Sequence, residues 1–298
     1  VHYHFPWPFM DMVHLLTGIK KPTIVTYHSD IVRQKNLLKL YKPLMHYFLN
    51  QVNHIVTTSP NYLESSDILR HYQHKTSVIP IGLARETYPQ ISDSYLKDWQ
   101  KKLPPRFFLF IGILRYYKGL HTLLEALKGI DFPLVIAGTG PEELALKQQA
   151  EKNNLKNVYF IGKITEKEKV ALLSLAYAFV FPSHLRSEAF GISLLEAAMF
   201  GKPLISCEIG TGTSYINQQN STGLVVPPQD PVALKQALNY LWQDEERAKK
   251  MGVHAGERFE CFFLADFCDV DFAGFWDFDA RDGGKFATRV FFEREKRL

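Results

Sequence analysis

The sequence predicts an α/β protein made of two domains, each with a parallel sheet that helices cover on both faces. Short apolar, β-rich runs alternate with longer segments whose apolar residues recur at helical spacing, which is typical of such sheets. The chain of 298 residues is also longer than one ordinary mixed domain. A polar segment with three prolines, residues 89–106, separates two such series and is interpreted as a linker.

Ten strands are expected, with helices between them. Leu120, Leu123, Leu124 and Leu127 form the clearest apolar stripe at helical spacing. The expected strands are Val1–Phe5, Thr23–His28, His54–Ser59, Thr76–Ile81, Phe107–Leu114, Pro133–Gly138, Asn157–Ile161, Tyr177–Pro182, Pro203–Cys207 and Gly223–Val226.

These elements divide the chain into a partial N-terminal domain, residues 1–88, and a fuller C-terminal domain, residues 107–259. The expected first strand begins at Val1 itself, so we interpret the sequence as lacking its N-terminal part. Residues 260–298 hold nine of the 22 phenylalanines, and much of this stretch has neither helical nor strand periodicity. This divergent tail is therefore assigned no fold.

The composition argues against several classes of function. A net charge of +4 is too mild for a nucleic-acid binder, which usually carries a dense basic stripe. Three cysteines without a CxxC pair argue against a disulfide scaffold and a structural zinc site. No run reaches the ~18 apolar residues of a membrane span. We expect a cytoplasmic protein, with the inner face of the cytoplasmic membrane as an alternative site.

The strongest motif is the segment 187–196, SEAFGISLLE, which follows an apolar strand and opens a helix. Glu188 and Glu196 stand eight residues apart, which on a helix places them on nearly the same side. A loop entering a helix presents free N–H groups to anions, and carboxylates accept hydrogen bonds from sugar hydroxyls. The alternative is a helix-start residue facing the dipole and a solvated helix position. The full string favours a functional site.

A second motif is the strand–helix junction GILRYYKG, residues 112–119. It begins at Gly112 and carries two cations, Arg115 and Lys118. Arginine can chelate a diphosphate and lysine can neutralise it. Two fixed cations could also stabilise a departing nucleoside diphosphate in place of a metal. The alternative is a surface loop before a helix.

The string SEAFGISLLEA resembles the signature of retaining glycosyltransferases of the GT-B architecture, family 4, the glycosyl transferases group 1. The resemblance extends over about residues 1–259 and implies two Rossmann-like domains, the N-terminal one incomplete. It implies that Glu188 contacts hydroxyls of the transferred sugar, together with the backbone of Phe190, Gly191 and Ile192. It also implies that Glu196 holds the ribose.

The resemblance extends to both cations. Lys118 matches the family's lysine, whereas the family's arginine more often directly follows the first glycine. Ile113 stands at that position here, and Arg115 comes two residues later. We take both as catalytic candidates.

Three further places are candidate site residues. Gly138 ends a strand in a tight turn near the donor, and the family places the nucleobase against the backbone near Gly162, Lys163 and Ile164. His28 lies at a strand end in the N-terminal domain, and strand ends in such sheets line ligand crevices. The resemblance implies that this histidine faces the donor sugar across the cleft.

The resemblance implies a hexosyltransferase with no cofactor and no metal, acting on a nucleotide-sugar and a glycan or lipid-linked acceptor. The strings VHYHFPWPFMD and YHSDIVRQ most resemble mannosyltransferases of bacterial surface polysaccharides such as lipopolysaccharide, so GDP-mannose is the expected donor and a UDP-hexose the second. A non-catalytic nucleotide-sugar-binding or scaffold protein is the alternative, and a sugar-nucleotide epimerase fits the motif poorly. Residues 33–47 predict either an interfacial helix that makes peripheral membrane contact or a packed helix with a solvated basic face.

Overall fold

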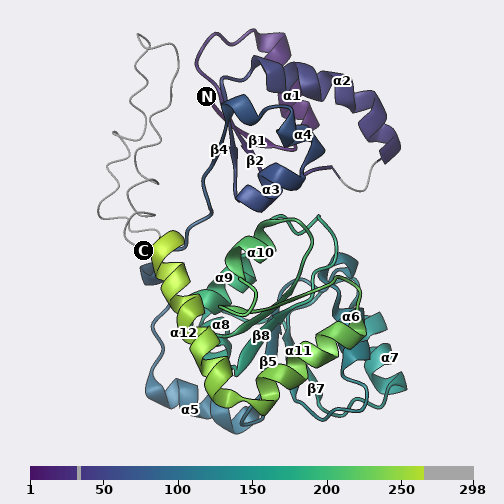
Figure 1. Ribbon diagram of the computed structural model, residues 1–298, viewed down its shortest axis with the longest axis vertical. Helices are drawn as coiled ribbons and strands as arrows, with labels where there is room; N and C mark the ends of the chain where they lie inside the picture. The colour runs from purple at the N-terminus through teal and green to yellow at the C-terminus, as the bar shows by residue number, and fades with distance from the viewer. Residues whose placement is uncertain (32–34, 265–298) are drawn as a thin grey trace.

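The computed structural model describes residues 1–31 and 35–264. It has two α/β domains, one above the other in Figure 1, joined by the segment that follows β4. Each domain contains one parallel sheet flanked by helices, which confirms the predicted fold class. The expected tail from residue 265 onward lies outside the described residues.

The first sheet has the strand order β1-β2-β3-β4, so consecutive strands are neighbours. Its core contains Phe5, Val25 and Ile55, all nearly fully buried. The strands are β1 (His2–Phe5), β2 (Ile24–Tyr27), β3 (His54–Thr57) and β4 (Thr76–Val78). The helices are α1 (Pro8–Thr17), α2 (Lys35–Gln51), α3 (Pro60–Ser65), α4 (Asp67–Arg70) and the 3-10 turn η1 (Gln73–Lys75).

The second sheet has the order β10-β9-β8-β5-β6-β7. The chain starts at β5, builds outward through β6 and β7, and then returns to the other side of β5 with β8. Four of its strands are buried along their whole length, as expected for a sheet covered on both faces. The strands are β5 (Phe108–Ile111), β6 (Leu134–Ala137), β7 (Val158–Gly162), β8 (Ala178–Phe181), β9 (Leu204–Cys207) and β10 (Gly223–Val226).

Helices surround this second sheet, and α12 runs along its edge back toward the first domain (Figure 1). They are α6 (Leu120–Ala126), α7 (Glu143–Lys152), α8 (Glu166–Leu175), α9 (Ile192–Met199), α10 (Gly212–Ile216), α11 (Pro231–Gln243) and α12 (Glu245–Phe262), with the 3-10 turn η3 (Tyr116–Lys118).

All ten expected strands are present, although most are shorter than expected. The largest differences are at the ends of β4 and β5, where apolar residues continue beyond the hydrogen-bonded strand. Leu114, for example, is fully buried but lies three residues past the end of β5. Burial therefore continues past the end of the strand, and the apolar pattern alone does not mark that end.

The expected linker contains a helix, α5 (Asp93–Lys102), in addition to the 3-10 turn η2 (Arg85–Thr87) before it. The hydroxyl of Ser92 caps α5 by accepting from the N–H of Tyr95, and α5 packs against α8. Residues 260–262, which the composition grouped with the tail, continue α12. Just beyond α12, Leu264 forms an isolated parallel bridge with Leu83 in the connecting segment.

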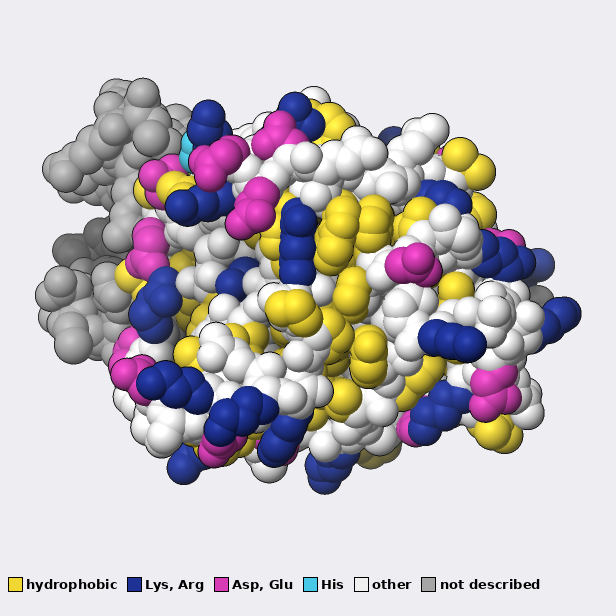
Figure 2. All heavy atoms as spheres, turned by 90° about the horizontal axis from the view of Figure 1, so that it is seen from below, with side chains coloured by type: hydrophobic (Ala, Val, Ile, Leu, Met, Phe, Trp, Pro, Cys, Tyr) yellow, Lys and Arg dark blue, Asp and Glu magenta, His cyan; other side chains and the backbone are white. Residues whose placement is uncertain are grey.

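The two domains meet where α3 faces α10 (Figure 1). The amide of Asn61 donates to the hydroxyl of Ser214 at 3.1 Å across this contact. On the outer face of the second domain, basic and acidic side chains are interspersed around a band of hydrophobic ones (Figure 2). The described part of this face therefore carries no stripe of one sign.

Helix α2 is packed on one side and exposed on another. Its second half packs Met45 and Phe48 into the core of the first domain. Leu37, Leu40 and Tyr47 are exposed on the same helix. One face of α2 is thus a packed face, and another presents apolar side chains to solvent.

Candidate functional site

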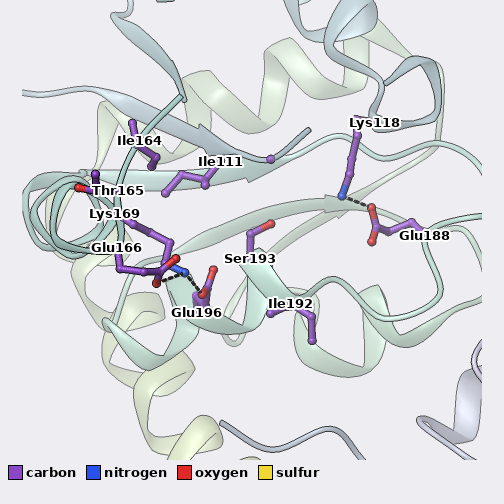
Figure 3. Close-up of a pocket in the computed structure, with 11 residues that line it drawn as sticks. Ile111, Lys118, Ile164, Thr165, Glu166, Lys169, Glu188, Ile192, Ser193 and Glu196 are labelled. Atoms are coloured by element: carbon purple, nitrogen blue, oxygen red, sulfur yellow. Dashed lines mark hydrogen bonds and ion pairs between the residues drawn. The ribbon is translucent and has the colours of Figure 1, made fainter. Parts of the chain in front are cut away.

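A pocket opens beside the carboxyl ends of β5 and β8, where the strand order of the second sheet reverses. Open α/β sheets bind ligands outside such a reversal. The cavity has a volume of about 440 Å³, which is within the range of small-molecule sites. Eleven residues line it (Figure 3): Ile111, Gly112, Lys118, Ile164, Thr165, Glu166, Lys169, Glu188, Ile192, Ser193 and Glu196.

The loops that follow β5 and β8 are held against each other. Gly119 has φ +71°, and a Cβ at this position would lie 1.9 Å from the carbonyl oxygen of Pro182. Only glycine therefore fits there. The N–H of His184 also donates to the carbonyl of Tyr117 at 2.9 Å. These contacts fix the two loops that carry Lys118 and Glu188.

Lys118 and Glu188 form an ion pair at one end of the pocket, with side chains only 10% and 12% exposed. The Glu188 carboxylate also accepts from the hydroxyl of Ser183 at 3.1 Å. The ammonium of Lys118 lies 4.7 Å from the centre of the Phe181 ring, a cation–π distance. A nearly buried cation beside a carboxylate can bind a phosphate and a hydroxyl in adjacent positions.

Helix α9 begins at the same pocket. Its N-cap, Gly191, has no side chain to cap the helix, and Ile192 and Ser193 from its first turn line the cavity. The first N–H groups of a helix have no partner within it, so they attract anions together with the helix dipole. Figure 3 shows Ser193 between the Lys118–Glu188 pair and a second charged group that contains Glu196 and Lys169.

A second charged group lies at the other end of the pocket. Glu196 accepts from the hydroxyl of Tyr88 at 2.9 Å and from the ammonium of Lys169 at 2.6 Å. Lys169 also pairs with Glu166 at 2.7 Å. Burial alone would lower the pKa of Lys169, but the hydrogen bonds with Glu166 and Glu196 and the charges of these carboxylates together outweigh burial and raise it. Burial first, and then Glu196, raises the pKa of Tyr88.

The structure brings together six of the residues predicted for the site. Gly112, Lys118, Ile164, Glu188, Ile192 and Glu196 all line the pocket. The other predicted residues are not among its lining residues: His28, Arg115, Gly138, Gly162, Lys163, Phe190 and Gly191.

Several of these other residues have different positions in the second domain. The N–H of Gly138 donates to the carbonyl of Gly162 at 2.7 Å and so joins the ends of β6 and β7. Phe190 is buried and packs edge-on against Phe263. Arg115 is exposed, at the N-cap of η3.

His28 lies directly after β2 in the first domain. Its Nε2 atom is 2.8 Å from Nδ1 of His4, and the two rings are stacked. Partial burial of the ring, followed by the charges of His4 and His2, lowers the pKa of His28. The imidazole is therefore biased toward its neutral form, in which one nitrogen accepts a hydrogen bond.

Sequence reasoning missed Ile111, Thr165, Glu166, Lys169 and Ser193 among the lining residues. The last four are at helix starts that follow strands. Thr165 and Glu168 form a capping box at the start of α8, and this pattern can be recognised in a sequence. A capped helix directly after a strand of a parallel sheet points to the same crevice edge.

Two features are absent from the described residues, 1–31 and 35–264. No helix there is long and apolar enough to cross a membrane. No three His, Cys, Asp or Glu side chains there are grouped so that they could hold a metal ion.

Comparisons with known proteins agree with this geometry. Residues 92–258, more than half of the chain, match the family model described as glycosyl transferases group 1. D-rhamnosyltransferase WbpZ of Pseudomonas aeruginosa is 59% identical over 265 residues, which cover 89% of this chain and 70% of that protein. O-antigen chain mannosyltransferase C of Escherichia coli is 51% identical over 266 residues, covering 89% and 71%.

The fold also matches solved structures. The Anabaena protein HepE in complex with UDP-glucose superposes with a TM-score of 0.73 at 17% identity, over 88% of this chain and 74% of that one. The chain therefore belongs to the glycosyl transferases group 1 family and is a glycosyltransferase of GT-B architecture.

Proposed function

We propose that this enzyme transfers a sugar of the manno configuration from its GDP-linked donor to the growing saccharide of an O-antigen, with retention at the anomeric carbon. The similarity to a D-rhamnosyltransferase and to an O-antigen mannosyltransferase supports both the sugar and the acceptor class. D-Rhamnose is 6-deoxy-D-mannose, so the two sugars share the configuration at C2, C3 and C4. Mannose is the first candidate, and the resemblance to retaining enzymes supports retention.

The observation that carries this proposal is the arrangement of charge in the pocket. Lys118 and the start of α9 offer a cation and free N–H groups to a diphosphate. Glu188 lies beside them and Glu196 lies at the far end of the pocket. We assign Glu188 to a hydroxyl of the transferred sugar and Glu196 to the ribose. Negative charge grows on the leaving diphosphate during transfer, so fixed positive groups there lower the barrier.

A donor screen tests the proposal. The chain is incubated with GDP-mannose, GDP-D-rhamnose and UDP-glucose, each with and without a lipid-linked saccharide acceptor, and release of nucleoside diphosphate is measured. GDP-linked manno donors should give acceptor-dependent release, and the product's anomeric proton in NMR should report retention. Preference for UDP-glucose would overturn the sugar assignment, and binding of donor without release would point to a non-catalytic binding protein.

We also propose that the enzyme contacts the cytoplasmic membrane surface through α2. The helix exposes Leu37, Leu40 and Tyr47 beside two exposed cations, Lys39 and Lys42. Exposed apolar side chains beside basic ones favour an anionic lipid surface. The chain should sediment with vesicles that contain phosphatidylglycerol more than with phosphatidylcholine vesicles. Leu40→Glu should abolish this difference, whereas Leu144→Glu, an exposed position on α7 of the second domain, should not.

A further inference from the structure

Arg186 belongs to the loop after β8, but it bonds mainly to the other domain. Its Nη2 donates to Oδ2 of Asp30 at 2.9 Å, and its Nη1 donates to the hydroxyl of Ser65 at 2.8 Å. Nη1 also donates to the carbonyl of Gly210 at 2.9 Å, and the guanidinium lies 4.8 Å from the centre of the Tyr62 ring. One side chain thus joins the β8 loop, the loop before α10 and the first domain.

Asp30 is fixed by its own domain as well. Its Oδ1 accepts from the hydroxyls of Tyr27 and Ser66 at 2.8 and 2.7 Å. Its backbone N–H donates to the hydroxyl of Tyr62 at 2.6 Å. These bonds leave Oδ2 for Arg186, and the two side chains are only 21% and 29% exposed. A charge-assisted bond between pre-oriented groups is stronger than an ordinary surface ion pair.

The same loop carries Glu188 two residues later. The N–H of Glu188 donates to the carbonyl of Leu185 at 3.0 Å, which closes a turn with Arg186 inside it. Anchoring Arg186 therefore anchors the backbone of Glu188, whose carboxylate pairs with Lys118 in the pocket. On the other side of the contact, Asp30 stands two residues after His28.

We propose that Arg186 and Asp30 are positioning residues that hold Glu188 in place for the donor sugar only while the two domains are in contact. This inference rests on the proposed function, because it assumes that Glu188 contacts the sugar. The nucleoside diphosphate relies on Lys118 and on the Glu196 end, so its binding does not require the Arg186 bonds. The interdomain contact is thereby required for correct placement of the sugar but not for binding of the nucleotide.

Calorimetry with GDP and with GDP-mannose tests this difference. Arg186→Met and Asp30→Asn should keep the Kd for GDP within about twofold of wild type and reduce kcat for sugar transfer about tenfold or more, because small misplacements of reacting groups are costly. Arg186→Lys keeps the positive charge but loses the forked guanidinium, so its kcat should lie between those of wild type and Arg186→Met. The kcat of the double variant should be no lower than that of Arg186→Met, since both substitutions break the same Arg186–Asp30 contact.

Hydrogen exchange of the peptide 183–191 provides a readout that does not depend on any donor. This peptide should exchange faster in Arg186→Met and in Asp30→Asn than in wild type. The matched control is Arg247→Met, which breaks an arginine–aspartate pair within the second domain and should change neither exchange nor turnover. Asp30→Asn keeps nearly the same shape, so it tests the contact even if Arg186→Met does not fold.

Two results would overturn the positioning role. One is unchanged exchange of peptide 183–191 in both variants, and the other is an equal loss of affinity for GDP and GDP-mannose. If wild type binds neither ligand, the proposed function fails, while the exchange measurement still decides whether Arg186 holds the Glu188 turn.

Discussion

The pocket has a lysine–glutamate pair at each end, and the two pairs are held in different ways. Lys118 and Glu188 stand on loops that are locked together at Gly119 and Pro182. Lys169 and Glu196 stand on helices α8 and α9, whose backbones are fixed by their own hydrogen bonds. The loop end is also tied to the first domain, whereas the contacts of the helix end lie in the second domain and the segment leading to it.

This difference separates two tasks within one cavity. A pair on helices suits tight and constant binding of the part of the donor that does not react. A pair on loops that reach the other domain suits the reacting part of the donor, because the position of these loops depends on whether the two domains are in contact. Changes at the loop end should therefore affect mainly turnover, and changes at the helix end mainly affinity.

The largest effect is expected from Lys118→Ala. The variant loses the nearly buried cation beside the expected diphosphate, so kcat should fall about 100- to 1000-fold, as when one preorganised charge-stabilising donor is removed. Steady-state kinetics of nucleoside diphosphate release measures it. Lys128→Ala removes a surface lysine from the same domain and is the matched control. Near-normal turnover in Lys118→Ala would show that the loop end of the pocket does not take part in the chemical step.

Glu188→Gln should reduce kcat by about 100-fold, because a neutral amide binds a hydroxyl less well and no longer offsets Lys118. The Kd for GDP should stay within a few-fold of wild type, since the cation remains. Calorimetry and kinetics on the same preparation separate the two quantities. An equal loss of GDP affinity and kcat would mean that Glu188 contributes to binding of the whole donor. It would contradict the division of tasks between the two ends of the pocket.

Glu196→Gln should weaken binding of GDP about tenfold, which corresponds to losing a hydrogen bond to a charged group. At saturating donor, kcat should remain within a few-fold of wild type. Glu125→Gln, on an exposed pair of the same domain, is the control. A large loss of kcat with unchanged affinity would assign Glu196 to the reacting end instead.

The smallest effect concerns stability at alkaline pH. The pKa of Lys169 is raised above its usual 10.5, so its charge stabilises the folded state fully below that value. This stabilisation is lost as the pH rises through the raised pKa. Lys169→Met should therefore show a smaller fall of Tm than wild type as the pH rises above about 10.5. Lys147→Met removes a lysine from the partly exposed ion pair of α7, and its Tm should fall with pH as that of wild type does.

The sequence predicted the architecture well because burial and alternation are local signals. Every expected strand exists, and the motif residues Lys118 and Glu188 meet because β5 and β8 are neighbours in the sheet. The pairing partners of Glu196 were not predictable in the same way. Tyr88 lies 108 residues away along the chain and Lys169 lies 27 residues away, so only the folded topology brings them to it.

The sequence did not locate α5 or the end of α12, for two separate reasons. Helix α5 was missed because its residues are polar and flanked by prolines, although Ser92 followed by Asp93 is a typical helix start. The domain boundary at residue 259 falls inside α12, because the phenylalanine-rich composition of the tail begins within the helix, at Phe262. Composition averaged over a segment does not locate the residue at which a helix stops.

The bridge between Leu83 and Leu264 attaches the end of α12 to the segment that connects the two domains. The N–H of Leu83 also donates to the carbonyl of Phe263 at 2.9 Å. The connecting segment is thus fastened to a helix of the second domain at Leu83. The part of the connection that can absorb a change in domain orientation therefore lies before Leu83.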